Sequence, residues 1–305
     1  MSSGFSWNLI DDVRQMLAYH FMLNALRSGT IVAVVAGAIG YLVVLRRQAF
    51  AAHTLSVIGF PGAAGAVWLG LNPAFGFFGF CLAGALVIAA LPGSGRAVTS
   101  PGAGQETAVI GTVQATALAF GFLFLSLFHG FLTDLNSLLF GVITGITDDQ
   151  VLVLLAAGAA CLLVVALIGR PLLFASIDPD VARARGLPVR LLSAIFLIVL
   201  GVAAAGTSQV TGSLLVFALL IAPPATALRL TARPALGIAI SVALSVAVVW
   251  VGETIAFYTP YPIGFWVTTL AFGAYLLATG YRHLADRHAR RTPPAAPAAL
   301  VRAAA

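Results

Sequence analysis

Residues 191–228 read LLSAIFLIVLGVAAAGTSQVTGSLLVFALLIAPPATAL, a run of 38 residues without a charged side chain. As one helix the run would be about 57 Å long, nearly twice the hydrocarbon thickness of a bilayer. The polar segment 206–212 (GTSQVTG) interrupts the run, and we expect the chain to break there. The break leaves two short helices or a re-entrant segment, and either form places this stretch inside a membrane.

Further apolar stretches of membrane-spanning length lie on both sides of this run. Residues 48–95 carry no Asp, Glu or Arg and are long enough for two spans, separated by a turn near Leu71-Asn72-Pro73. The other spans are expected within 21–45, 107–133, 150–169, 236–257 and 263–281. The fold class predicted from these stretches is an all-α membrane protein, a polytopic bundle of eight or nine transmembrane helices. The number depends on whether 191–206 and 212–228 both cross the membrane.

The composition supports a protein that lies mostly in a bilayer. Of the 305 residues, 60% are apolar and only 9% are charged, and the mean hydropathy is +1.03. A soluble domain carries about 25% charged residues. The same figures exclude a disordered chain, a collagen-like fibre and a disulfide-rich secreted domain. Cys81 and Cys161 lie in apolar runs and are expected as small buried residues.

The basic residues exclude several classes of function. All 16 are Arg, and a P-loop ATPase needs a lysine at its phosphates, so ATP hydrolysis on this chain is excluded. The sequence also contains neither HExxH nor GxSxG, and we expect a protein that is not an enzyme. The net charge of +6 does not indicate nucleic-acid binding, because the arginines follow the ends of spans rather than form a patch.

The arginine positions predict the orientation, because cytoplasmic loops are enriched in Lys and Arg. If the start of the chain lies outside, 14 of the 16 arginines fall in inside segments, and the C-terminus is cytoplasmic. These segments are 46–53, 92–105, 170–190, 229–235 and the tail from 282. We expect an interfacial helix on the outer surface in 1–20, a transmembrane domain over 21–282, and a disordered, Pro/Ala-rich tail over 283–305.

Small residues recur at helical spacing, as in Gly29, Ala33 and Gly37, and this spacing lets helix backbones approach closely. Ionisable side chains at membrane depth are costly and are candidates for function. Among them, Glu106 fits the start of a helix dipole, and Glu253 is expected to be solvated near the outer interface. His53 follows a pair of arginines into the second span, about 9 Å along the helix from Arg47.

The surroundings of His53 resemble a known signature. The run 45–62 (LRRQAFAAHTLSVIGFPG) is similar to the second span of the ABC-3 family, the permease subunits of bacterial zinc and manganese ABC importers. The family has an arginine pair, an Asp, a Ser-His pair three and four residues later, and Pro-Gly. Residues that match this pattern are Arg46, Arg47, Ser56, Pro61 and Gly62.

Two positions depart from the pattern, and they alter the metal ligands that the resemblance implies. His53 stands where the family has the Asp, and Val57 stands where it has the His. The expected metal-contacting residues are therefore His53, with Ser56 or Thr54 as a weak oxygen donor and Glu106 from another helix. Imidazole in place of carboxylate favours Zn²⁺ over Mn²⁺.

The resemblance extends to 106–111 (ETAVIG), 134–141 (DLNSLLFG), 217–228 and the inside loop 178–188 (DPDVARARGLP). The loop also has the capping pattern of a short helix: Asp178 as N-cap, Pro179 at the first position, Asp180 in the first turn and Gly186 past the end. The family resemblance implies that this helix docks on the ATPase. The expected coupling residues are Asp178, Pro179, Asp180, Ala182, Arg183, Gly186 and Leu187.

The resemblance implies a type II-like permease of an ATP-driven importer for divalent transition metals, zinc first and manganese second, in a bacterial inner membrane. No permanently bound cofactor is expected. The implied partners are an ABC ATPase dimer, an extracytoplasmic metal-binding protein, a second copy of the chain and membrane lipid. Two alternatives stay open: a permease of the vitamin B12 or siderophore type, and a secondary transporter or channel without an ATPase.

Overall fold

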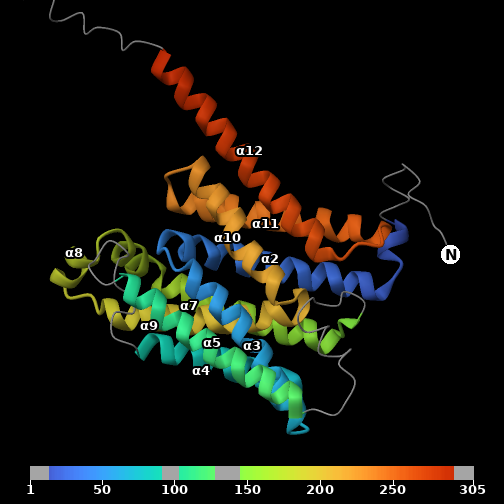
Figure 1. Ribbon diagram of the computed structural model, residues 1–305. Coiled ribbons are helices and arrows are strands. Elements are labelled where there is room, and N and C mark those ends of the chain that lie inside the picture. Colours follow the sequence, from blue (N-terminus) through green and yellow to red (C-terminus); the bar gives the residue numbers. More distant parts are fainter. Residues whose placement is uncertain (1–13, 91–102, 128–144, 292–305) are drawn as a thin grey trace, which may run out of the picture.

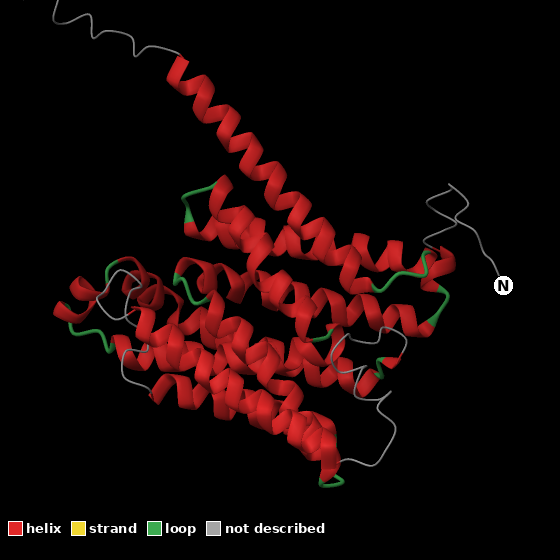
Figure 2. Ribbon diagram, in the orientation of Figure 1, coloured by secondary structure: helices red, strands yellow, loops and turns green. Residues whose placement is uncertain are grey.

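The computed structural model describes residues 14–90, 103–127 and 145–291, and in these residues the regular structure is entirely helical (Figures 1 and 2). The helices are α2 (His20–Leu45), α3 (Ala49–Trp68), α4 (Pro73–Ala90), α5 (Ala103–Leu127), α7 (Asp148–Ile177), α8 (Pro179–Ala184), α9 (Val189–Thr211), α10 (Ser213–Leu230), α11 (Pro234–Tyr258) and α12 (Ile263–Arg291).

Eight of the described helices are long and apolar enough to cross a membrane, and Leu215–Leu230 in α10 is an apolar helix below that length. The prediction of an all-α bundle is confirmed. The long apolar run breaks at Gly212, the last residue of the predicted break. Gly212 has φ 80° and ψ 151°, a conformation that is essentially restricted to glycine.

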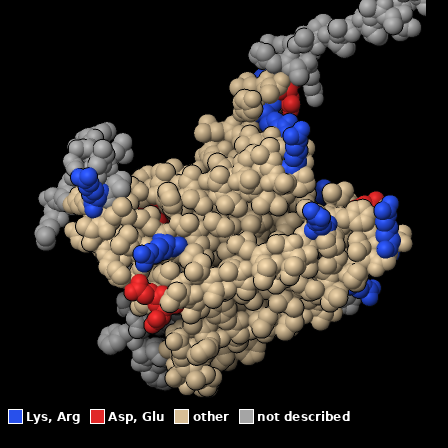
Figure 3. Space-filling view, turned by 180° about the vertical axis from the view of Figure 1, so that it is seen from behind, with Lys and Arg blue, Asp and Glu red and all other residues tan. Residues whose placement is uncertain are grey.

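The bundle has a buried centre and an apolar exterior. Helices α2, α3 and α9 are mostly buried, whereas α4, α5, α7 and α12 expose much of their surface. The exposed side chains are largely apolar, for example Phe122, Leu167 and Leu277. In Figure 3 most charged side chains lie toward the ends of the bundle, with an uncharged band between them. This distribution is the one that a bilayer requires.

Small residues bring pairs of helices into close contact, as their spacing predicted. A Cβ on Gly37 of α2 would lie 2.8 Å from the Val242 Cα of α11, and Ser241 donates a hydrogen bond to the Gly37 carbonyl at 2.7 Å. Between α3 and α4, a Cβ on Gly62 or on Gly76 would overlap the carbonyl oxygen of the other glycine. A larger residue at these positions would force the helices apart.

Helices α2 and α3 end in the same backbone motif. At the end of α3, Gly70 has φ 72° and Leu71 N–H donates to the Ala66 carbonyl at 2.8 Å. At the end of α2, Arg47 takes the glycine position with φ 57°, and Gln48 N–H donates to Val43 at 2.9 Å. These are Schellman motifs, which satisfy the last carbonyls of a helix.

The structure bears on the predicted regions at the two ends of the chain to different extents. Residues 1–13 of the predicted interfacial helix lie outside the described residues. At the other end α12 continues to Arg291, so helix occupies the first part of the region 283–305 that was expected to be disordered. Residues 292–305 also lie outside the description.

Candidate functional site

One face of α3 is less buried than the rest of that helix. It consists of Phe50, His53, Val57 and Phe60, which are the residues of 50–60 that keep partial or full exposure. Their spacing of three, four and three residues places them along one side of a helix. We call this face the His53 strip. It includes both positions at which the sequence resemblance placed the metal path.

His53 is half-buried in the strip, and its ring packs against Phe217 of α10. The two ring centroids lie 4.8 Å apart with an interplanar angle of 65°. Among the described residues, neither ring nitrogen of His53 has a hydrogen-bond partner, so a lone pair is available for a metal ion. No three His, Cys, Asp or Glu side chains of the described part lie together. Among the described side chains of the His53 strip, His53 is the one strong metal ligand.

The hydroxyl groups beside His53 already have partners. Ser56 is fully buried and donates a hydrogen bond to the Ala52 carbonyl of its own helix at 2.8 Å. Thr54 is also buried, and it donates to Gln114 of α5 at 2.9 Å. The structure therefore does not bring Ser56 into the His53 strip.

The predicted third contributor, Glu106, belongs to the first turn of α5, and its side chain lies outside the described part of the chain. Helices α3 and α5 run parallel, because Phe50 lies beside Gly111 and Pro61 lies beside Gly121. With a rise of about 1.5 Å per residue, the backbone of Glu106 is about 12 Å from the level of the imidazole along the helix axis.

Glu253 corrects an expectation from the sequence. It was expected to be solvated, but its side chain is only 3% exposed and lies between α11 and α2. A Cβ on Gly29 would overlap its Oε1 atom, and its Oε2 atom is buried with no hydrogen-bond partner among the described residues. No pattern near Glu253 in the sequence indicates this burial, which depends on the missing side chain of Gly29 on another helix.

The short helix predicted in the loop 178–188 is present as α8, and its capping is as expected. The Asp178 carboxylate accepts hydrogen bonds from Asp180 N–H (3.2 Å) and Val181 N–H (3.0 Å), and Pro179 occupies the first turn. Asp180 and Arg183 form an exposed ion pair at 2.7 Å.

A third Schellman motif ends α8. Gly186 has φ 80°, and Leu187 N–H donates to the Ala182 carbonyl at 3.1 Å. Ala182 is completely buried and Leu187 packs against the core, whereas Val181, Arg183 and neighbouring residues are exposed. The helix is therefore anchored on one side and presents the other at one end of the bundle (Figure 1). We call this end the α8 end.

Sequence reasoning missed the role of Arg46, which connects three helices at the α8 end. Its guanidinium donates to Ser176 of α7 at 3.0 Å and to Ser193 of α9 at 2.6 Å, and it lies over the Phe196 ring at 5.3 Å. Helices α7 and α9 are the two that flank α8. The α2–α3 turn, three residues before the start of the strip helix, is thereby joined to both supports of α8.

Comparison with known proteins places this arrangement in a family. The model of the ABC 3 transport family matches residues 18–282, which include every helix of the bundle except the end of α12. The chain belongs to the ABC 3 transport family. The sequence resemblance to that family is therefore confirmed.

Two similar proteins are named as manganese transport proteins. The chain is 30% identical to the manganese transport system membrane protein MntC of Halalkalibacterium halodurans, over 72% of this chain and 73% of the relative. It is 31% identical to the manganese import system permease protein ScaB of Streptococcus parasanguinis, over 72% and 74%. A third relative, the chelated iron transport system membrane protein YfeC of Yersinia pestis, is 29% identical over 94% and 97%.

Solved structures share the fold of this ABC 3 transport family member. PsaBC from Streptococcus pneumoniae in complex with Fab matches with a TM-score of 0.76 and 26% identity, over 88% of this chain and 95% of that chain. An inward-facing putative metal-chelate type ABC transporter matches with a TM-score of 0.69 at 16% identity, which shows the fold alone. The chain is accordingly a membrane permease subunit of the ABC transporter type and not an enzyme.

Proposed function

We propose that this chain is the membrane permease of an ATP-driven importer for a divalent transition metal ion. The observation that carries the proposal is His53, whose ring nitrogens are free of hydrogen bonds in the described part of the chain and lie on the half-exposed strip of α3. The manganese and chelated-iron relatives support a metal as the cargo. The ion is cargo here, so weak and incomplete coordination favours its release.

The single ligand of the strip supports a pore made by two copies. A metal ion that passes between two copies would meet a His53 from each, which gives two imidazoles where one copy has one. An ATPase dimer on the α8 end and an extracytoplasmic binding protein at the opposite end would complete the importer. With the arginine-rich α8 end in the cytoplasm of a bacterial cell, the protein would lie in the inner membrane with its C-terminus inside.

Two observations bear on the ion and favour different metals. The relatives described by their metal as manganese proteins support Mn²⁺. The imidazole of His53, where the family resemblance expects a carboxylate, supports a borderline ion such as Zn²⁺. We propose divalent transition metals as the substrate class, and the experiment below compares the two ions directly.

The contacts at the α8 end support a route from ATP to the strip. Closure of the ATPase pair would displace α8, and α8 is held by α7 and α9. Arg46 bonds to both of these helices and precedes α3 in the chain, so displacement of the supports would shift the start of the strip helix. This is a two-state mechanism in which the strip opens alternately to each side.

Radiometal uptake tests the proposal. Cells without their own importers would express the chain with its ATPase and binding protein, as wild type, His53→Ala and Ser56→Ala, and would receive labelled zinc or manganese. We expect uptake that requires an ATPase-active partner, falls at least tenfold in His53→Ala, and is kept in Ser56→Ala because that hydroxyl bonds its own helix. Membrane abundance of each variant is the control.

Other results would change the proposal in defined ways. Equal uptake by wild type and His53→Ala would keep the metal importer but remove His53 from the path. Uptake without an active ATPase would establish a secondary transporter. Uptake of neither ion by an assembled complex would overturn the proposal in favour of a metal chelate, which the chelated-iron relative supports as the second candidate.

A further inference from the structure

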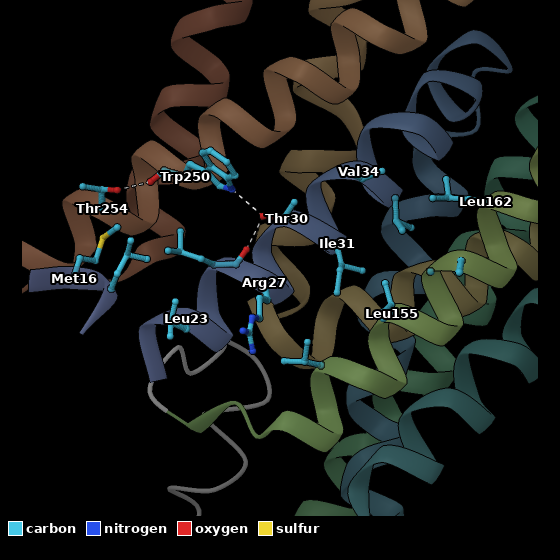
Figure 4. A pocket seen from close by; sticks show the side chains of 16 residues that line it. Met16, Leu23, Arg27, Thr30, Ile31, Val34, Leu155, Leu162, Trp250 and Thr254 are labelled. Carbon is cyan, nitrogen blue, oxygen red and sulfur yellow. Dashed lines mark hydrogen bonds between the residues drawn. The ribbon is translucent and has the colours of Figure 1, made fainter. Parts of the chain in front are cut away.

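A large groove lies in the exterior of the bundle, far from the His53 strip. It has a volume of about 910 Å³ and is formed by the first halves of α2 and α7 and the last part of α11 (Figure 4). These segments lie at the end of the bundle opposite α8. Its walls are apolar, with Leu23, Ile31 and Val34 on α2 and Leu155 and Leu162 on α7. We call it the outer groove.

Among the described residues that line the outer groove, Arg27 alone is charged. It lies seven residues into α2, and its side chain is exposed between Leu23 and Leu155 (Figure 4). Within the described residues it has neither an ion pair nor a hydrogen bond through its side chain. Asp148 at this end forms its ion pair with His20 at 3.3 Å, and Arg27 acts on this carboxylate only through its charge, without an ion-pair contact.

The depth of Arg27 can be estimated from the length of α2. The helix has 26 residues and is about 39 Å long, which exceeds the hydrocarbon thickness of about 30 Å by about 4 to 5 Å at each end. Arg27 is about 10 Å from the start of the helix, so its Cα lies about 6 Å inside the hydrocarbon. An arginine side chain reaches from this depth to the phosphate layer.

The far wall of the groove is held in place by a hydrogen bond. The Trp250 indole N–H of α11 donates to the Thr30 hydroxyl of α2 at 2.8 Å, and Thr30 donates to the Leu26 carbonyl at 2.6 Å. The Trp250 ring is half-exposed. A tryptophan with an apolar body and a bonded N–H is typical of the membrane interface.

We propose that the outer groove binds an anionic phospholipid, with an acyl chain along the apolar walls and the phosphate at Arg27. The guanidinium supplies the charge and the paired N–H donors that a phosphate accepts. A lipid satisfies both the apolar walls and a cation that forms no ion pair among the described residues, whereas a purely apolar protein helix would bury that cation without a hydrogen-bonded anion. The site stands independently of the transported ion.

Quenching of tryptophan fluorescence by brominated lipids tests this site in the full-length chain. Trp7, Trp68 and Trp266 would be replaced by Phe, which leaves Trp250 as the probe. The chain would be reconstituted in phosphatidylcholine vesicles that contain a small fraction of acyl-brominated phosphatidylglycerol or acyl-brominated phosphatidylcholine. We expect the apparent binding of phosphatidylglycerol to be about fivefold stronger than that of phosphatidylcholine, because one arginine near the membrane surface attracts an anionic headgroup by about this factor.

Two pairs of variants separate the site from general lipid contact. Arg27→Gln should abolish the preference, and Arg14→Gln, an exposed arginine of the same end, should keep it. Ala159→Phe, which fills the groove, should reduce quenching by both lipids, and Ala160→Phe, exposed outside the groove, should not. Phosphatidylglycerol that copurifies with the unmodified chain and its Arg27→Gln variant gives a second measurement, with a severalfold loss expected in the variant.

Two results would overturn the proposal. Equal quenching by both lipids in the wild type and in Arg27→Gln would show ordinary annular lipid. Absence of quenching by either lipid, in a chain that keeps its helix content, would show that protein occupies the groove, either a second copy or another segment of this chain.

Discussion

At the scale of single residues, the chemistry of the strip depends on which side chains α3 leaves without partners. Three polar residues follow each other closely on this helix, but Thr54 and Ser56 have hydrogen-bond partners, whereas His53 has a ring contact and no hydrogen bond within the described part. The neighbours of position 53 in the sequence are enough to select it as a candidate ligand. The sequence could not predict that Ser56 bonds to its own backbone, because a serine three residues from a ligand fits either role.

Val57→His would add a second imidazole one helical turn beyond His53. Both residues lie on the half-exposed strip. Because a second imidazole would strengthen zinc binding, we expect the half-saturating metal concentration for uptake to fall on the order of tenfold to hundredfold. Transport assays over a range of zinc concentrations would measure it. Val57→Leu is the matched control, and an equal fall in that variant would contradict a role for the strip in coordination.

Gly29→Ala tests the contact of α2 with the buried Glu253. The new Cβ would overlap Glu253 Oε1 and would lie 2.8 Å from a Val249 methyl group, so we expect a loss of about 1–3 kcal/mol from overpacking. This corresponds to a Tm lowered by several degrees in detergent micelles. Gly169→Ala on α7, where nothing lies within 4 Å, should keep the Tm or raise it slightly. Equal Tm values for the two variants would refute the contact.

At the scale of elements, the sequence predicted where helices end better than it predicted which helices contact one another. The caps of α8 and the turn at Asn72 depend on residues within a few positions of each other, so local chemistry decides them. The hydrogen bonds of Arg46 reach serines that are 130 and 147 residues away in the chain. The burial of Glu253 depends on Gly29, which lies on another helix. No local sequence pattern specifies either contact. The sequence located the break at Gly212 only to within the segment 206–212, because either glycine of that segment could break a helix.

Arg46→Gln would loosen the connection between α3 and the helices that flank α8. If α8 transmits ATPase motion, we expect ATP hydrolysis by the complex to remain while the number of ions transported per ATP falls at least severalfold. Arg47→Gly is the matched control: it removes the neighbouring arginine and relieves its φ of 57°, so it should keep the ratio and the Tm. A loss of assembly in Arg46→Gln, with an unchanged ratio in the remaining complex, would indicate a structural role alone.

At the scale of the whole molecule, the two ends of the bundle differ in charge. The α8 end has most of the described arginines, and the opposite end has Asp148, Asp149 and the outer groove. Composition and periodicity predicted the number of helices well because each span must be apolar over a fixed length. They could not predict which helices are central, since all the spans are apolar on every side.

The orientation can be measured with single cysteines in a Cys81→Ser, Cys161→Ser background. We expect a cysteine at Ala184, exposed in α8, to react with an impermeant maleimide only after the membrane is opened. A cysteine at Thr147, at the start of α7, should react in intact spheroplasts. The reverse pattern would place the α8 end outside and would exclude ATPase docking there.

The hydrogen bonds of Arg46 can form only after much later parts of the chain have been synthesised. Ser193 follows Arg46 by 147 residues, so at 5–20 residues per second the ribosome needs about 7–30 s to supply this partner. Ser176 is made 17 residues earlier than Ser193, so Arg46 gains its two serine partners one after the other. With the α8 end in the cytoplasm, as proposed above, the positive charge of Arg46 would meanwhile help to retain the turn between α2 and α3 on the cytoplasmic side. In that orientation the same guanidinium would act twice: first as a topological signal during insertion, and afterwards as the hydrogen-bond donor that joins the N-terminal part of the chain to helices synthesised later.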